Sequence, residues 1–268
     1  VHHVLIYAVD ANAGYTPGQV YPGCTGPGGG RLLGGYAPGS GPQLFPDAGT
    51  KMGIPLADDD VIVLAMHYPQ GSFGQVDSTY VNFHYYPDGT SGVREVFANP
   101  LIESWNFVLP PNQETTLAFD YPQFGVLMDS MSILSIFPHN HLLGKSWIVY
   151  ATGPNNDTIP LISIPKWDFD WQGFYFFDYI KKIPAYYRIH CEAVYDNTTA
   201  NPWNPNNPPQ LVFPGLNTSD EMFLCYLHYL PYEPGDENIH MASILTNPVP
   251  VDDRADEDDF SLVAYPNP

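Results

Sequence analysis

Histidines are as frequent in this chain as the other basic residues combined, and several stand at spacings that suit metal binding. There are 9 histidines against a total of 9 lysines and arginines. His139 and His141 are separated by one residue after an apolar run, and residues i and i+2 of a strand share a face, so both imidazoles can reach one ion. His2 and His3 open another apolar run, where they can share an ion only at a strand end or a bulge. Each pair alone also fits ordinary surface histidines.

Two further side chains, His67 and Met222, are candidate metal ligands beside these histidine pairs. His67 ends the apolar run 61–66, and Met222 follows an Asp-Glu pair. In such places a histidine is ordinarily a core or rim residue and a methionine a filler of the core. As ligands, imidazole suits both oxidation states of copper, whereas a thioether favours Cu(I). The set of His2, His3 and His67 matches a zinc site equally well, so Met222 is the residue that argues for copper.

Short strands are expected to position these side chains. Apolar runs bounded by Gly, Pro, Asn or Asp recur along the chain, as is typical of β-strands. We expect strands over residues 4–9, 61–66, 80–86, 92–97, 131–137, 147–151, 161–164 and 187–194. Residues 14–53 and 197–214 hold many of the Gly and Pro residues and are expected to be ordered surface loops.

The composition predicts an all-β protein. Aromatic residues make up 15% of the chain and charged residues only 14%, with 29 prolines and 23 glycines, the profile of many short strands joined by turns. At 268 residues the chain is long enough for two domains that each bury a core. We therefore predict two antiparallel β-sandwich, jelly-roll-like domains in tandem, residues 1–98 and 99–248, followed by an acidic linker over residues 249–268.

The charge balance excludes two classes of partner. Lys and Arg total 9 against 29 Asp and Glu, a formal net charge of −20. Nucleic acid is excluded because neutralising phosphates requires clustered cations, and polybasic binding to a membrane surface fails for the same reason. The apolar runs are also far shorter than the roughly 20 residues that cross a bilayer, so no membrane span is expected.

Taken in order along the chain, the histidine and methionine motifs resemble one enzyme family. A His-His pair opening an apolar strand is followed by a strand-end His-Tyr, by His-x-His-x-x-Gly-Lys over residues 139–145, and by Asp-Glu-Met over residues 220–222. The same order is typical of the copper type II, ascorbate-dependent monooxygenases, which include peptidylglycine α-hydroxylating monooxygenase and dopamine β-monooxygenase. Bacterial members are similar also at residues 36–39, 45–47, 167–172, 195–197 and 201–202. The resemblance covers about residues 2 to 230.

The resemblance implies two copper ions and a hydroxylating activity. It implies that the electron-transfer copper of the first domain is bound by His2, His3 and His67. The catalytic copper of the second domain would be bound by His139, His141 and Met222. Tyr226 matches a family tyrosine near that copper, and an ordinary strand aromatic is the alternative. Ascorbate or another one-electron donor would reduce the copper ions, and O2 would be used to hydroxylate a C–H bond of a small or peptide-like substrate.

The sequence departs from the family pattern at two positions, which bear on the expected substrate and on the expected disulfide. The peptide-hydroxylating branch has an arginine, suited to a substrate carboxylate, where this chain has Phe137. Peptide amidation is therefore not expected, and an apolar or neutral aromatic substrate fits better. The family's cysteine directly follows the methionine, whereas Phe223 stands there in this chain. Cys225 lies two residues further along and keeps the same strand face, so by resemblance we expect a disulfide between Cys191 and Cys225.

Both ends of the sequence suggest a longer, exported protein. Family members have strands upstream of the His-His pair, so this sequence is expected to begin inside its first domain, with a partner for Cys24 outside it. Residues 265–268, Tyr-Pro-Asn-Pro, resemble the opening of the sorting domain carried by type IX secretion cargo in Bacteroidetes, and a Pro-rich turn is the alternative. We expect a secreted or cell-surface bacterial protein whose partners include that secretion machinery.

Other functions fit the same residues. One is a non-catalytic secreted protein that binds or sequesters copper, and another is a surface interaction module whose metal role has lapsed. The histidines without a partner pattern are expected to be structural, namely His84, His190, His228 and His240.

Overall fold

The fold is all-β. In the computed structural model, the described residues are 3–21, 26–37, 40–46, 49–68 and 71–241. They form strands, and the helical content among them is one short 3-10 turn, Asp236–Asn238. The prediction of an all-β protein with antiparallel, sandwich-like sheets is confirmed. His2, Cys24 and residues 249–268 lie outside the described residues. Within the described part, no helix has the length and apolar character needed to cross a membrane.

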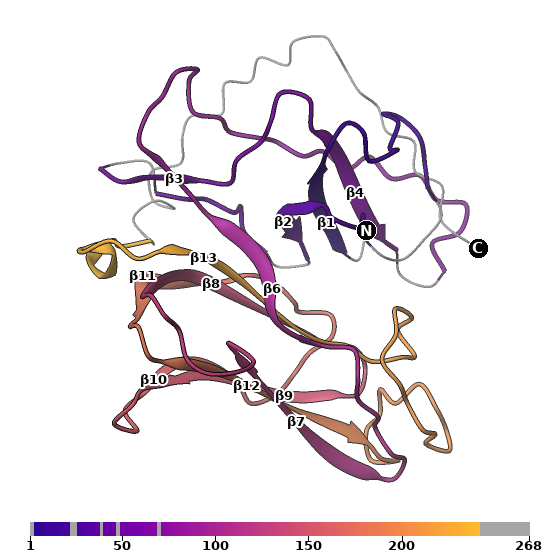
Figure 1. Cartoon of the computed structure of the whole chain (residues 1–268). Helices are drawn as coiled ribbons and strands as arrows, with labels where there is room; N and C mark the ends of the chain where they lie inside the picture. The colour runs from indigo at the N-terminus through magenta and orange to yellow at the C-terminus, as the bar shows by residue number, and fades with distance from the viewer. Residues whose placement is uncertain (1–2, 22–25, 38–39, 47–48, 69–70, 242–268) are drawn as a thin grey trace. The chain divides into compact units, whose positions relative to one another are not determined.

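The chain divides into two compact units, and residues 3–95 are the described part of the first (Figure 1). Its strands are β1 (His3–Val9), β2 (Arg31–Tyr36), β3 (Lys51–Gly53), β4 (Val61–His67) and β5 (Val93–Glu95). β1 is the central strand of an antiparallel sheet in the order β2-β1-β4, and β3 pairs in parallel with β5. Val4, Ala8, Leu32 and Met52 are buried in this unit.

The second unit, Val96–Met241, is a β-sandwich. Its strands are β6 (Phe97–Ser104), β7 (Gln113–Tyr121), β8 (Met131–His139), β9 (Gly144–Thr152), β10 (Thr158–Ile164), β11 (Tyr175–Ile183), β12 (Arg188–Asn197) and β13 (Phe223–Pro231). They form two antiparallel four-stranded sheets, β10-β9-β12-β7 and β11-β8-β13-β6, which lie one over the other in Figure 1. Inward-facing side chains from both sheets make one contiguous core.

Alternating burial along the strands explains why the sheets of the second unit pack together. In β12 every second residue is buried, from Ile189 to Asn197, so one face enters the core and the other carries polar groups. The Phe223 ring of β13 lies 4.7 Å from the Trp147 ring of β9 and 4.8 Å from the Phe119 ring of β7, measured between ring centroids. These contacts join the two sheets, because β13 belongs to one sheet and β7 and β9 to the other.

The predicted boundary between residues 98 and 99 lies inside β6. The chain passes from the first unit to the second between Glu95 and Val96. The Asn99-Pro100 pair, which suggested a break, is part of β6 and faces β13. β6 is the edge strand of its sheet, and an edge strand tolerates proline because one row of its backbone groups needs no partner.

Most of the strands expected from apolar runs are present. Runs 4–9, 61–66, 131–137, 147–151, 161–164 and 187–194 lie within β1, β4, β8, β9, β10 and β12, apart from Tyr187, which precedes β12. Residues 92–97 contribute β5 and the start of β6. β7 and β11 were not predicted, because their polar and charged residues obscure the alternation.

Two expectations about the first unit were wrong. Residues 80–86 form no strand, although aromatic residues recur along them, because no neighbouring strand pairs with them. Tyr80 is exposed, and Tyr86 is anchored instead through its hydroxyl, which lies 3.0 Å from the carbonyl oxygens of both Pro46 and Met52. The loop expected over residues 14–53 contains β2 and β3.

Candidate metal centre

Strands β8 and β13 bring the second-unit candidate residues together. His139 ends β8 and Tyr226 lies on β13, whereas His141 follows β8 and Met222 immediately precedes β13. Phe223 and Cys225 of β13 point into the core, so Met222, Leu224 and Tyr226 belong to the opposite face. Leu224 is the direct cross-strand partner of His139, and Tyr226 is the partner of Phe137. Directly opposed residues share a face of a sheet. The end of β8 and the beginning of β13 are therefore brought together on the side facing away from the core.

His139 and His141 lie side by side, as their spacing predicts. Their ring centroids are 5.3 Å apart and their planes are nearly perpendicular, at 87°. The Nδ1 atom of His139 is 2.6 Å from Oε1 of Gln172, and the Nδ1 atom of His141 is 3.1 Å from the carbonyl oxygen of Asp220. Both partners are acceptors, so each Nδ1 carries the proton and donates it. Nε2 is then the ring nitrogen that would bind a metal ion, an arrangement common to metal-binding histidines.

Gln172 is itself held in the orientation that this hydrogen bond requires. Its Nε2 donates to the carbonyl oxygen of Phe169 at 2.7 Å, which turns Oε1 toward His139. The ring of Phe169 lies 6.1 Å from the ring of His141, edge-on. One short segment therefore orients the first imidazole and packs against the second.

A buried carboxyl group links the two ligand-bearing segments. Glu221 is fully buried, and its Oε2 accepts hydrogen bonds from the backbone N–H of His141 at 2.8 Å and of Met222 at 3.2 Å. Its Oε1 accepts a third bond from the N–H of Leu143 at 2.7 Å. Burial raises the pKa of Glu221 to about 8, and the three N–H donors oppose that rise. Glu221 thereby fixes the backbone beside Met222 against the backbone beside His141.

Both backbone polar groups of Met222, its N–H and its carbonyl oxygen, are hydrogen-bonded. Its N–H donates to Glu221, and its carbonyl oxygen accepts a 2.7 Å hydrogen bond from the hydroxyl of Tyr195, a fully buried core residue. The Met222 side chain is only 9% exposed. The thioether is therefore largely shielded from solvent on a backbone that cannot easily shift.

Aromatic rings form a wall beside His139. The Phe137 ring stacks on Tyr226, with centroids 5.7 Å apart, and lies 4.9 Å from the Phe174 ring. The Phe137 centroid is 6.0 Å from that of His139. Phe137 is thus an apolar ring packed among other aromatic rings. An uncharged, flat group suits this wall better than a carboxylate.

In the first unit, the structure brings together two of the three candidate histidines. His3 begins β1 and His67 ends β4, and they are direct partners across the antiparallel pair. Their rings stack, with centroids 4.1 Å apart and planes 28° apart. His2 lies outside the described residues.

Within the described residues, no group of three or more His, Cys, Asp or Glu side chains is placed to hold a metal ion. The second-unit set contributes only two residues of these types, because its third member is a methionine. The first-unit set includes His2, which lies outside the described residues.

No family model matches the chain, and no curated protein matches it. Among solved structures, the infectious bursal disease virus VP2 subviral particle is 11% identical, with a TM-score of 0.24 over 67% of this chain and 44% of that chain. The structure of the infectious bursal disease virus Gx strain is also 11% identical, with a TM-score of 0.24 over 90% of this chain and 65% of that one. At these TM-scores the likeness carries no argument about function.

The predicted Cys191–Cys225 disulfide is not present. Both cysteines are free and fully buried in the core between the two sheets. The two thiols are hydrogen-bonded neighbours, and burial together with this contact raises the pKa of Cys191 well above its ordinary value. In such surroundings a thiol packs as a small apolar side chain, and the thiolate needed for disulfide exchange is disfavoured.

The sequence did not predict the residues that hydrogen-bond to the candidate ligands or to their backbone, namely Gln172, Glu221 and Tyr195. Gln172 and Glu221 stand in segments that contribute to the family resemblance, yet nothing in the sequence pairs either with a histidine. Tyr195 is likewise distant in sequence from Met222. The signal is weak because each contact depends on how strands pair and where loops return, rather than on local spacing.

His228 is fully buried next to this wall, consistent with the structural role expected of it. Its Nδ1 is 2.7 Å from Oγ of Ser135, and its ring stacks on Phe174 with centroids 4.4 Å apart. Burial lowers the pKa of His228 to about 3. The imidazole is therefore neutral in the folded protein at neutral pH.

The lowered pKa of His228 predicts a loss of stability in acid. The unfolded chain takes up a proton near the ordinary histidine pKa, whereas the folded chain does not until about pH 3. Stability from this residue is thus fully present above about pH 6.5 and is lost as the pH falls. Between pH 7 and about pH 4.5, the unfolding free energy of the parent should fall by about 2 to 3 kcal/mol more than that of His228→Gln. Urea unfolding at both pH values, followed by tryptophan fluorescence, measures this difference, and equal losses would contradict it.

Proposed function

We propose that the protein is a copper-dependent monooxygenase that hydroxylates a C–H bond, using O2 and a one-electron donor such as ascorbate. The observation that supports this most is the convergence of His139, His141 and the segment carrying Met222, with the Nδ1 atoms of both histidines already hydrogen-bonded. His139 ends β8, His141 follows it, and Met222 immediately precedes β13.

The donor set of the second unit fits copper. Two imidazoles and one thioether suit Cu(I), and hard oxygen-seeking ions would require carboxylates instead. The carboxyl group of Glu221 lies beside both ligand segments, and its oxygens are occupied by backbone N–H groups. When bound, copper would supply the one-electron chemistry that activates O2 for hydroxylation.

The chain's own residues would orient the ligands and the substrate. Gln172 and the Asp220 carbonyl accept hydrogen bonds from Nδ1 of the two imidazoles, which favours the tautomer whose Nε2 would bind copper. Glu221 keeps the histidine and methionine segments at a fixed spacing. The wall of Phe137, Tyr226 and Phe174 would bind an apolar or neutral aromatic part of the substrate and exclude water beside His139.

For the first unit, we propose a second copper site bound by His3 and His67 together with His2. The direct pairing and stacking of His3 and His67 support a shared ion at that end of the sheet. Three imidazoles also suit zinc, and metal analysis of the loaded chain distinguishes the two ions. An electron-transfer role follows from copper at this site, because zinc does not change oxidation state.

Metal loading and turnover test the proposal. The full chain is loaded with copper, dialysed and analysed for metal, then supplied with ascorbate, O2 and ethylbenzene as a neutral aromatic probe. We expect two copper ions per chain and ascorbate-dependent formation of a hydroxylated product, detected by gas chromatography. His84→Gln is the control, because His84 belongs to neither ligand set. Copper binding with no ascorbate-driven O2 consumption would instead identify a copper-sequestering protein, and absence of bound copper would contradict both.

A further inference from the structure

A hydrogen-bonded line of three side chains crosses the outer face of the other sheet of the second unit. Thr152 of β9, His190 of β12 and Asp120 of β7 contribute one residue each. Oγ1 of Thr152 is 2.7 Å from Nε2 of His190, and Nδ1 of His190 is 2.7 Å from Oδ1 of Asp120. The sheet β10-β9-β12-β7 that carries them is distinct from the sheet that carries His139 and Met222.

Asp120, as an acceptor, receives the hydrogen bond from Nδ1–H of His190. In the neutral imidazole, Nε2 then accepts from the hydroxyl of Thr152. Asp120 is fixed in turn by Arg188, whose Nη2 is 3.0 Å from Oδ2 and 2.6 Å from the carbonyl oxygen of Gln123. A hydroxyl next to a base that is oriented by a carboxylate is the arrangement of a hydrolytic triad. The His190 side chain is 21% exposed, so an external molecule can reach it.

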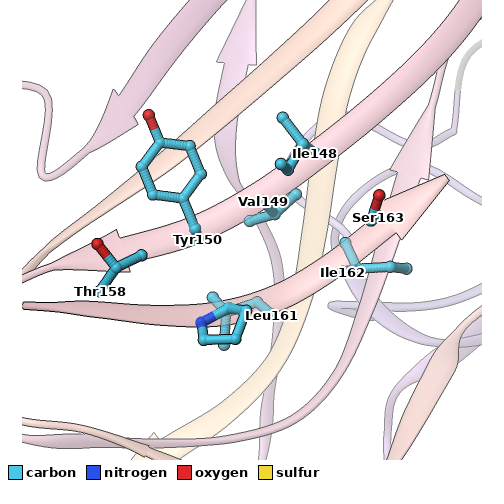
Figure 2. Close-up of a pocket in the computed structure, with 8 residues that line it drawn as sticks. Ile148, Val149, Tyr150, Thr158, Leu161, Ile162 and Ser163 are labelled. Carbon is cyan, nitrogen blue, oxygen red and sulfur yellow. The ribbon is translucent and has the colours of Figure 1, made fainter. Parts of the chain in front are cut away.

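Residues of β9 and β10 line a hollow of about 390 Å³, and Figure 2 shows their side chains. Thr158, which lines it, is the direct partner of Thr152 across β9 and β10. Tyr150, another lining residue, stacks on His190 with ring centroids 4.9 Å apart. In Figure 2, Tyr150 and Thr158 stand at one end of the hollow and Ile148 and Ile162 at the other. An apolar group placed in the hollow would therefore extend away from the Thr152 hydroxyl.

We propose that Thr152, His190 and Asp120 form a second active site, which hydrolyses uncharged esters of apolar carboxylic acids. The hollow takes the acyl group, because isoleucine, leucine, valine and proline side chains contribute most of its lining. Anionic esters are disfavoured by Asp120 and by Glu192, which accepts a 2.7 Å hydrogen bond from the Tyr150 hydroxyl. The site uses no metal and does not depend on the proposed copper chemistry.

The reaction balances without any further reactant except water. Oγ1 of Thr152 attacks the ester carbonyl carbon while Nε2 of His190 takes the hydroxyl proton. The bond from the carbonyl carbon to the alcohol oxygen breaks, and His190 returns its proton to the departing alcohol. Nε2 of His190 then takes a proton from water, and the water oxygen attacks the acyl carbon. The bond from that carbon to Oγ1 of Thr152 breaks, His190 returns the proton to Oγ1, and the carboxylic acid is released. Asp120 stabilises the imidazolium that forms in each half of the cycle.

Hydrolysis of p-nitrophenyl butyrate by the full chain, pretreated with a chelator, tests this site. We expect Thr152→Ala and His190→Gln to reduce the rate at least about tenfold, and Thr152→Ser to retain it. Thr116→Ala is the matched control, because Thr116 is an exposed threonine on β7 outside the line and the hollow. A fluorophosphonate probe should label Thr152, as shown by peptide mass spectrometry. Equal rates in the parent and Thr152→Ala, or a label on another residue, would show a purely structural hydrogen-bonded line and overturn the proposal.

Discussion

Replacing His139 with alanine should remove copper from the second unit and abolish hydroxylation. The substitution deletes one of two imidazoles and leaves Gln172 without its 2.6 Å contact. His141 and Met222 alone would bind copper far more weakly, since one of the three proposed copper–ligand bonds is lost. The measured copper content should fall from two ions per chain to one, and product formation from ethylbenzene should fall to background. Metal analysis and gas chromatography on the same sample measure both quantities.

The His139→Ala result is informative because the remaining site acts as an internal reference. His3 and His67 belong to the other unit, so the copper that they are proposed to share should be unaffected. His84→Gln, which removes an imidazole from neither site, should keep both copper ions and full activity. A variant that loses both ions would indicate general misfolding, which circular dichroism detects. A variant with undiminished turnover would show that the proposed catalytic site is wrong.

The arrangement of the strands was largely predictable from local patterns. Apolar alternation and the i, i+2 spacing of His139 and His141 follow directly from the geometry of a strand, and both are found in the structure. Residues 80–86 show the alternation but form no strand, because no neighbouring strand pairs with them. Where strands were missed, as at β7, one face is exposed and polar, so the residues carry little signal. Strand prediction thus fails where pairing, rather than composition, decides.

The groups that support each site could not be predicted, for a related physical reason. Glu221 contacts the backbone of His141, 80 residues away in sequence, and backbone N–H groups leave no trace in the residue types. The line of Thr152, His190 and Asp120 depends on the register of three strands, because a shift of one residue would turn any member to the opposite face. No local pattern in the sequence links His190 to Thr152 or Asp120, so this line of hydrogen bonds could not be predicted.

Replacing Glu221 with alanine should destabilise the second unit and weaken its copper site together. The change leaves the backbone N–H groups of His141, Leu143 and Met222 buried without their acceptor. Each unsatisfied buried donor costs about 1 to 3 kcal/mol, so the unfolding free energy should fall by roughly 3 to 5 kcal/mol once partial relaxation is included. Urea unfolding, followed by tryptophan fluorescence, measures this loss.

Glu221→Gln separates the structural effect of Glu221 from its effect on the metal ligands. Glutamine keeps one carbonyl oxygen in nearly the same volume, so it can satisfy the donors on one side only, and its amide group faces the other as a donor itself. We expect Glu221→Gln to remain folded but to hold His141 and Met222 at an altered spacing. X-ray absorption of the Cu(I)-loaded protein should then show a weaker copper–sulfur contribution than in the parent. An unchanged copper–sulfur signal in a folded Glu221→Gln variant would show that this carboxyl group stabilises the fold without positioning the thioether.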